Sequence, residues 1–151
     1  MDLAKNWDFF NDIESKGASV WEIWWDKMLK ISNEKFRTAS KQLKTVSERR
    51  FQELIAKFPE DEIFDLPETS QKETAKEIVQ QALLSAIDSL QNWSAVNDGR
   101  EYTWADFKNT TIQHLLPPLT PFTVSGVQIG GNKNIINATS ITKPNVLHFG
   151  T

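Results

Sequence analysis

The chain has 151 residues, of which 39% are hydrophobic and 25% are charged, and its net charge is −3. This composition is typical of a globular domain, so disorder is not the default expectation. The charge balance argues against the basic footprint of a nucleic-acid-binding protein, and the lack of cysteine excludes disulfides and cysteine nucleophiles. No apolar run is long enough to predict a membrane span.

Residues 1–18 are predicted to form an irregular lead-in, because turn-forming Asn and Asp recur there and Gly17 is expected to mark its end. The first helix is expected to begin at Ser19, since Ser19 and Glu22 have the spacing of a capping box. Large apolar residues then recur at helical spacing, namely Trp21, Trp24, Trp25, Met28 and Leu29. Val20 and Ile23 fall outside that stripe, so this helix is apolar around more of its circumference than a surface helix.

A second helix is predicted in the charged stretch that follows. Thr45 and Glu48 have capping-box spacing, and Pro59 is expected to end the helix because proline cannot continue the hydrogen-bond ladder. One face of this helix is apolar and carries Phe51, Leu54, Ile55 and Phe58.

The clearest predicted helix runs from Ser70 to about Trp93, with Ser70 and Glu73 as a third capping box. Its apolar face is the longest in the chain and comprises Ala75, Ile78, Val79, Ala82, Leu83, Ala86, Ile87 and Leu90. Leu84 lies on the polar side of this helix, where it is expected to be exposed or to mark a second contact.

The character of the sequence changes after the turn signal at residues 97–99. Residues 122–129 and 135–141 are predicted to be strands around a hairpin-like connection at 130–132, and residues 146–149 form a third apolar run. The sequence therefore predicts a single α+β piece, mainly helical over residues 1–100, with loops and short strands over 101–151. A small antiparallel β element is expected at its C-terminal end.

The sequence offers few candidates for a chemical site. His114 and His148 lack the second histidine or carboxylate that a metal motif requires at i+3 or i+4. Ser125 lacks the first glycine of a nucleophile elbow, and the pair at 130–131 lacks the further glycines of a phosphate-binding loop. We therefore predict no catalytic, cofactor-binding or metal-binding residue in this chain.

Two clusters permit two interpretations each, and a third has one simple interpretation. Trp21, Trp24 and Trp25 are either a stacking platform for sugars or part of a packed core, which their helical spacing favours. The acidic residues 60–62 are either a calcium site or a solvated loop, and they lack the alternating oxygen ligands of an EF-hand. The arginines at 49–50 are most simply part of a charged helix face.

Several segments, taken in order, resemble the penicillin amidase (penicillin acylase) family. They are Asn6-Trp7-Asp8 before the Trp-rich helix, the threonine-led helix Thr69–Leu90, the stretch Trp104–His114, and Gly130-Gly131-Asn132 with Ile136-Asn137-Ala138. Ala105 stands where many members of the family have a glycine after the tryptophan. The chain stops at His148–Thr151, where the family's Gly-Pro-Ser-x-Arg-like stretch would start.

This resemblance implies an N-terminal nucleophile (Ntn) hydrolase of αββα architecture that cleaves a linear amide between an acyl group and an amine. The catalytic serine of such enzymes begins the β-subunit, and its own α-amino group is the base. None of those catalytic residues maps onto this chain. The chain is therefore expected to be the C-terminal part of a β-subunit, inactive alone. Its expected partners are the α-subunit and the N-terminal part of the β-subunit.

The resemblance further implies export of the parent protein, for example to the periplasm, and calcium in some members of the family. The broad apolar surface of the first helix and the strands at 122–141 are expected to make the isolated chain self-associate. The alternative interpretation is a stand-alone binding or interaction module that uses its tryptophan cluster.

Overall fold

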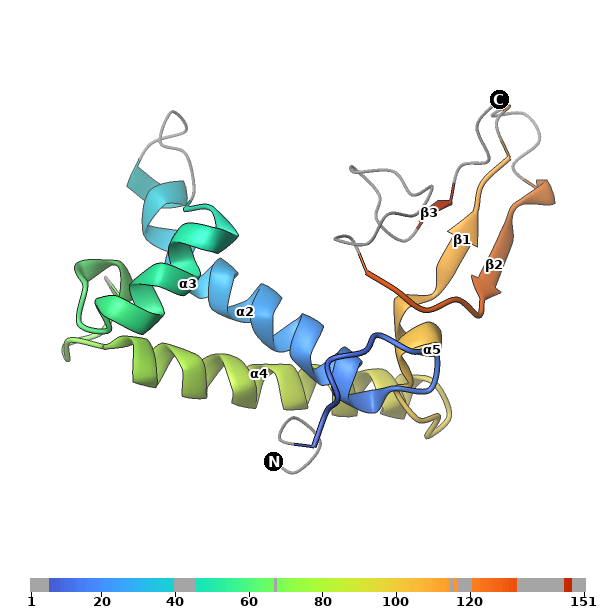
Figure 1. The fold of residues 1–151 in the computed structure, drawn as a ribbon, viewed down its shortest axis with the longest axis horizontal. Coiled ribbons are helices and arrows are strands. Elements are labelled where there is room, and N and C mark those ends of the chain that lie inside the picture. Colours follow the sequence, from blue (N-terminus) through green and yellow to red (C-terminus); the bar gives the residue numbers. More distant parts are fainter. Residues whose placement is uncertain are drawn as a thin grey trace. The chain divides into compact units, whose positions relative to one another are not determined.

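The computed structural model describes residues 6–39, 46–66, 68–114, 116, 121–132 and 146–147. It divides into two compact units (Figure 1). The helical unit comprises Glu22–Gln91, and the terminal unit comprises the residues up to Trp21 together with those from Asn92 onward. Helices α2 (Lys16–Ala39) and α4 (Ala75–Val96) each contribute residues to both units.

The helical unit is built around an aromatic core. Besides parts of α2 and α4 it contains α3 (Glu48–Lys57) and the short 3-10 helix η1 (Glu62–Phe64). The ring of Phe51 lies 5.7 Å from that of Trp25 and 5.8 Å from that of Phe64, measured between centroids. Tilted and edge-to-face aromatic contacts at such distances add about 0.5–1.5 kcal/mol beyond the burial of area. The core is completed by Met28, Leu54, Ile63, Ala75, Ile78 and Ala82.

Helix α2 begins one turn earlier than the sequence predicts. Its first turn is capped by Ser15, whose hydroxyl accepts the Ala18 N–H at 3.1 Å, and not by Ser19. Ser19 is fully buried inside the helix, and its hydroxyl has no hydrogen-bond partner among the described residues. The prediction that Ser19 caps the helix is therefore wrong, because burial takes that side chain away from the free N–H groups of the first turn.

The broad apolar surface of α2 is buried. Val20 and Ile23, which lie outside the predicted stripe, are both buried, and so is Met28. A helix that is apolar around most of its circumference needs cover on more than one side. The predicted stripe therefore included only part of the buried surface of α2.

The start of α3 also differs from the prediction. Ser47 is its N-cap, and the Ser47 hydroxyl accepts the Arg50 N–H at 3.3 Å. The predicted cap, Thr45, lies outside the described residues. The helix ends at Lys57, two residues before Pro59, as the sequence predicts.

The capping box of α4 lies four residues after the predicted one. Thr74 precedes the helix, and the Glu77 carboxylate accepts both the Thr74 N–H, at 2.9 Å, and the Thr74 hydroxyl proton. These hydrogen bonds, that of the hydroxyl first, hold the pKa of Glu77 below its ordinary value because they favour the charged carboxylate. The prediction of Ser70 and Glu73 as the capping box is wrong.

Glu73 instead closes the loop before α4. Its carboxylate accepts the Thr69 hydroxyl at 2.8 Å and the Leu66 N–H at 2.9 Å. The same two hydrogen bonds lower the pKa of Glu73. Glu73 therefore stabilises the loop before α4, and the hydrogen bonds at the start of the helix are made by Thr74 and Glu77.

The end of α4 follows the predicted turn. Asp98 and Gly99 adopt the left-handed conformation, with φ of 57° and 74°. The Gly99 N–H donates to the Ser94 carbonyl at 2.9 Å, so the turn satisfies a carbonyl at the end of the helix. Among the described residues, no helix combines the length and apolar character that crossing a membrane requires.

The terminal unit carries the short helix α5 (Trp104–Lys108) and a sheet of three strands (Figure 1). The sheet has the order β2-β1-β3, formed by β1 (Thr110–Ile112), β2 (Val124–Val127) and β3 (Val146–Leu147). Strand β1 pairs antiparallel with β2 and parallel with β3. The predicted α+β class, with a small antiparallel element toward the C-terminus, is confirmed.

The pairing of the strands was only partly predicted. Strand β2 lies within the predicted 122–129 and β3 within the predicted 146–149, but β1 was not predicted. The predicted hairpin partner, residues 135–141, lies outside the described residues. Strand β1 has only three residues, too few for an alternating pattern to show in the sequence.

The packing of α4 makes a direct prediction. Ile78 is fully buried in the core of the helical unit, whereas Leu84 on the same helix is 65% exposed. Ile78→Ala should lower the free energy of unfolding by about 2–5 kcal/mol, because it leaves a cavity, and Leu84→Ala should change it by less than about 0.5 kcal/mol. Urea denaturation of both variants measures the difference. Equal losses would mean that α4 packs through another face.

Candidate functional site

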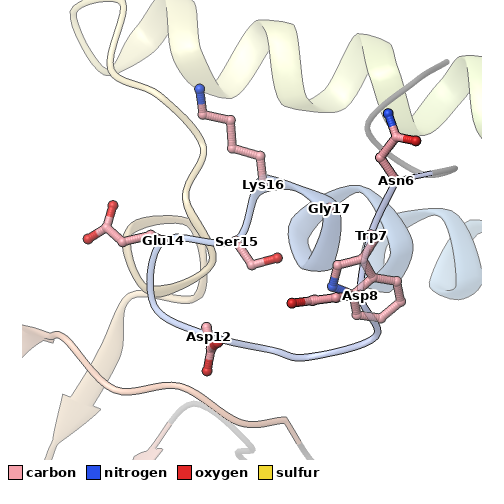
Figure 2. A pocket seen from close by; sticks show the side chains of 8 residues that line it. All are labelled: Asn6, Trp7, Asp8, Asp12, Glu14, Ser15, Lys16 and Gly17. Atoms are coloured by element: carbon pink, nitrogen blue, oxygen red, sulfur yellow. The ribbon is translucent and has the colours of Figure 1, made fainter.

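A hollow in the terminal unit lies at the start of α2 (Figure 2). It is an open depression of about 570 Å³. Its wall is a short loop that leads into the first turn of the helix, and it is lined by Asn6, Trp7, Asp8, Asp12, Glu14, Ser15, Lys16 and Gly17.

Trp7 organises this loop. Its indole Nε1–H donates to the Phe10 carbonyl at 2.8 Å, and its ring centroid lies 5.4 Å from that of Phe9 and 5.8 Å from that of Trp21. The Asp8 carboxylate accepts the Phe10 N–H at 3.0 Å. These bonds hold Phe9 in the left-handed region, at φ 67°, which costs a bulky residue on the order of 1–3 kcal/mol.

Residue 17 is a glycine because Trp7 leaves no room for a side chain there. A Cβ added at Gly17 would lie 2.7 Å from Cγ of Trp7. Gly17 was predicted to end the lead-in, but it lies within the first turn of α2. The reason for glycine here is therefore a close contact and not a break in structure.

The polar groups of the hollow have structural roles. Ser15 caps α2 through its hydroxyl, and the ammonium of Lys16 pairs with the Glu101 carboxylate. Asp12 and Glu14 are exposed. In the part of the chain that the structure describes, no three His, Asp or Glu residues are grouped closely enough to hold a metal ion. The hollow thus presents carboxylates and an aromatic wall, with its one serine hydroxyl engaged in the helix cap.

The histidine within the described residues contacts a backbone N–H and a phenylalanine ring. His114 is exposed, its Nδ1 accepts the Leu116 N–H at 3.1 Å, and its ring lies 6.4 Å from that of Phe122. His148 lies outside the described residues. Ser125 is on β2, where its hydroxyl is 3.3 Å from that of Thr111.

The tryptophans of α2 pack against other side chains of the protein. Trp24 and Trp25 are half-buried against the core of the helical unit, and the Trp24 Nε1–H donates to the Val79 carbonyl at 2.9 Å. Trp21 packs against Trp7 in the terminal unit. The packed-core interpretation is confirmed for Trp24 and Trp25, and all six tryptophans of the chain are at least half-buried.

The acidic residues 60–62 lie at the start of η1, where one of them bonds to the backbone. Asp61 is the N-cap of η1 and its carboxylate accepts the Ile63 N–H at 3.0 Å. Glu60 and Glu62 are exposed. The cluster is therefore a solvated helix start, in keeping with the interpretation as a loop.

Sequence reasoning missed the most buried cation of the terminal unit's described residues. Lys108, in the last turn of α5, donates through Nζ to the carbonyls of Gly130, at 2.8 Å, and Gly131, at 3.0 Å. Trp104, one turn earlier on the same helix, donates its indole N–H to the Gly131 carbonyl at 2.7 Å. The i, i+4 spacing of these two residues was the available signal, but the carbonyls they contact are more than twenty positions away.

The family model described as penicillin amidase matches residues 1–150 of the chain. Comparison with curated proteins and comparison with solved structures give no match. The family match covers both units and every element described above.

The contact between Trp7 and Gly17 predicts a coupled pair of substitutions. Gly17→Ala should destabilise the chain by about 1–3 kcal/mol, because the new methyl group overlaps the indole ring. In a Trp7→Gly background, which removes Cβ as well as the ring of Trp7, the overlap is gone, and Gly17→Ala should then stabilise the helix by up to about 1 kcal/mol. Urea denaturation of the four proteins in the cycle measures the coupling. An additive cycle would contradict the contact.

Proposed function

Because this chain belongs to the penicillin amidase family, we propose that it is a non-catalytic portion of a hydrolase that cleaves the amide C–N bond between an acyl group and an amine. The observation that carries the proposal is the family match over residues 1–150. The match supports a hydrolase as the parent protein, and the division of labour within that protein is our inference.

The use of hydroxyl groups supports a structural role. A serine or threonine nucleophile must reach the substrate and must contact a base that takes its proton. Three of the described hydroxyls instead bond at helix starts, those of Ser15, Ser47 and Thr74. Three others are buried inside the protein, those of Ser19, Ser32 and Thr110. Such hydroxyls stabilise the fold and are poorly placed to attack an amide.

We place the chemistry in the remainder of the polypeptide. In the Ntn mechanism that the family relationship suggests, the first residue of a β-subunit supplies both the nucleophile and the base. This chain would pack against that sheet-bearing part, with the α-subunit and the N-terminal part of the β-subunit as its partners. Calcium in the parent protein and export to the periplasm are further proposals that rest on the same relationship.

The proposal is tested by comparing two proteins. The 151-residue chain and the protein translated from its complete reading frame are incubated with phenylacetyl and longer acyl amides of a chromogenic amine, and with penicillins. We expect release of the amine by the complete protein and none above a buffer blank by the chain. Turnover by the chain alone would contradict the non-catalytic role, and a complete protein inactive across the panel would contradict the amidase assignment.

We also propose that the isolated chain self-associates through apolar side chains of the terminal unit. Phe9, Phe10, Phe122 and Val124 are all more than half exposed there. The Trp-rich helix, the other expected route, is less suited because its tryptophans are at least half-buried. Light scattering over a concentration series should show a rising mass, and Phe122→Ser should reduce it more than Leu84→Ser. A mass that stays monomeric at high concentration would contradict the proposal.

A further inference from the structure

The buried lysine of α5 lies in a setting that is unusual for its chemistry. Lysine is rarely buried unless its charge is compensated, yet Lys108 is only 7% exposed. Its ammonium donates to two adjacent backbone carbonyls, those of Gly130 and Gly131. The same nitrogen lies 5.5 Å from the centroid of the Trp104 ring, within the range of a cation–π interaction.

The two carbonyls are fixed from several directions. The Gly131 carbonyl also accepts the Trp104 indole N–H, at 2.7 Å, while the Gly131 N–H donates to the Asn11 carbonyl at 2.8 Å. A Cβ added at Gly130 would lie 2.7 Å from the same Asn11 oxygen, so the glycine lets the loop and the turn meet. The carbonyl oxygens are therefore oriented by contacts other than those of Lys108.

Oriented carbonyl oxygens beside an aromatic face recognise a particular class of ligand. A primary ammonium group has three N–H donors and a full positive charge, so it satisfies both carbonyls and the ring together. A quaternary ammonium satisfies the ring alone because it has no N–H. A sodium ion carries the charge but has neither N–H donors nor an alkyl stem to take the place of the Lys108 side chain.

We propose that the Gly130 and Gly131 carbonyls and the Trp104 ring form a binding site for a primary alkylammonium, which the side chain of Lys108 fills in the native chain. The site fastens the turn at Gly130–Gly131 to α5. Through the bond from Gly131 to Asn11 it also fastens the loop that precedes α2. Shortening Lys108 empties the site without removing the groups that form it.

The experiment is chemical rescue of Lys108→Ala in the whole chain. This substitution removes the equivalent of n-propylammonium and should lower Tm by on the order of 5–10 °C, because charge-assisted hydrogen bonds are lost. Adding n-propylammonium chloride should raise the Tm of the variant saturably. Tetramethylammonium chloride and NaCl at the same ionic strength should not. Lys72→Ala, which removes an exposed lysine, is the matched control and should neither lose stability nor respond to n-propylammonium.

Three outcomes would overturn the proposal. The first is equal rescue by all three salts, and the second is rescue by none of them. The third is a Lys108→Met protein that melts at the same temperature as the wild type, since methionine keeps most of the stem but has no charge or N–H donor.

A measurement on the native chain keeps the proposal testable if Lys108→Ala does not fold. Acetic anhydride labels free lysine amines, and mass spectrometry reports each site separately. Lys108 should be acetylated at least about tenfold more slowly than Lys72, because its reaction requires local opening of the site. Equal rates in the folded chain would overturn the proposal.

Discussion

The requirement to bury large indole rings while satisfying their N–H groups dominates the local structure of this chain. Three tryptophans meet that requirement in the same way. Trp7, Trp24 and Trp104 donate to the backbone carbonyls of Phe10, Val79 and Gly131, respectively. Two glycines follow from close packing near such rings: Gly17 lies against the ring of Trp7, and Gly130 lets the turn held by Trp104 approach Asn11. Two of these bonds join segments distant in sequence, since Trp24 and Val79 are 55 positions apart and Trp104 and Gly131 are 27 apart.

Helical spacing predicted where the helices lie but not where they start. The pattern of Ser or Thr followed three residues later by Glu occurs at Ser19, Thr45, Ser70 and Thr74, and Thr45 lies outside the described residues. Of the other three sites only Thr74 is bonded to its Glu at a helix start, so the choice depends on tertiary contacts. Ser19 is buried in the helix, and Glu73 is bonded back to Thr69 and Leu66. The end of α3 before Pro59 was predictable because it depends on the covalent structure of proline alone.

The C-terminal third and the buried lysine show the limit of sequence reasoning in a different way. Strand β1 is too short to show a period, and its partner β2 follows an intervening segment. Lys108 looks in sequence like an ordinary surface lysine at the end of a short helix. Its role is defined by Gly130 and Gly131, which no local pattern connects to it. The structural use of the described hydroxyls at helix starts could not be argued from the sequence either.

Membership of the penicillin amidase family and the structural use of these side chains lead to one account of the chain. Its aromatic residues pack within each of the two compact units. Its hydroxyls and carboxylates bond to the backbone at helix starts and in loops. We propose that in an amidase such a part supports the catalytic subunit, with the nucleophile supplied by another part of the protein. A chain with this role is expected to be sensitive to substitutions that disturb packing around the indole rings.

The central claim, that the tryptophans are structural and bonded to the backbone, is tested most directly by hydrogen exchange of the indole N–H groups, followed by NMR. The account predicts that the Nε1–H protons of Trp24 and Trp104 exchange far more slowly than those of free tryptophan, because each is bonded to a carbonyl inside the fold. It also predicts that added oligosaccharides leave their resonances unchanged. Exchange at the rate of free tryptophan, or resonances that shift with added sugar, would contradict the account and favour a surface that presents these rings to a ligand.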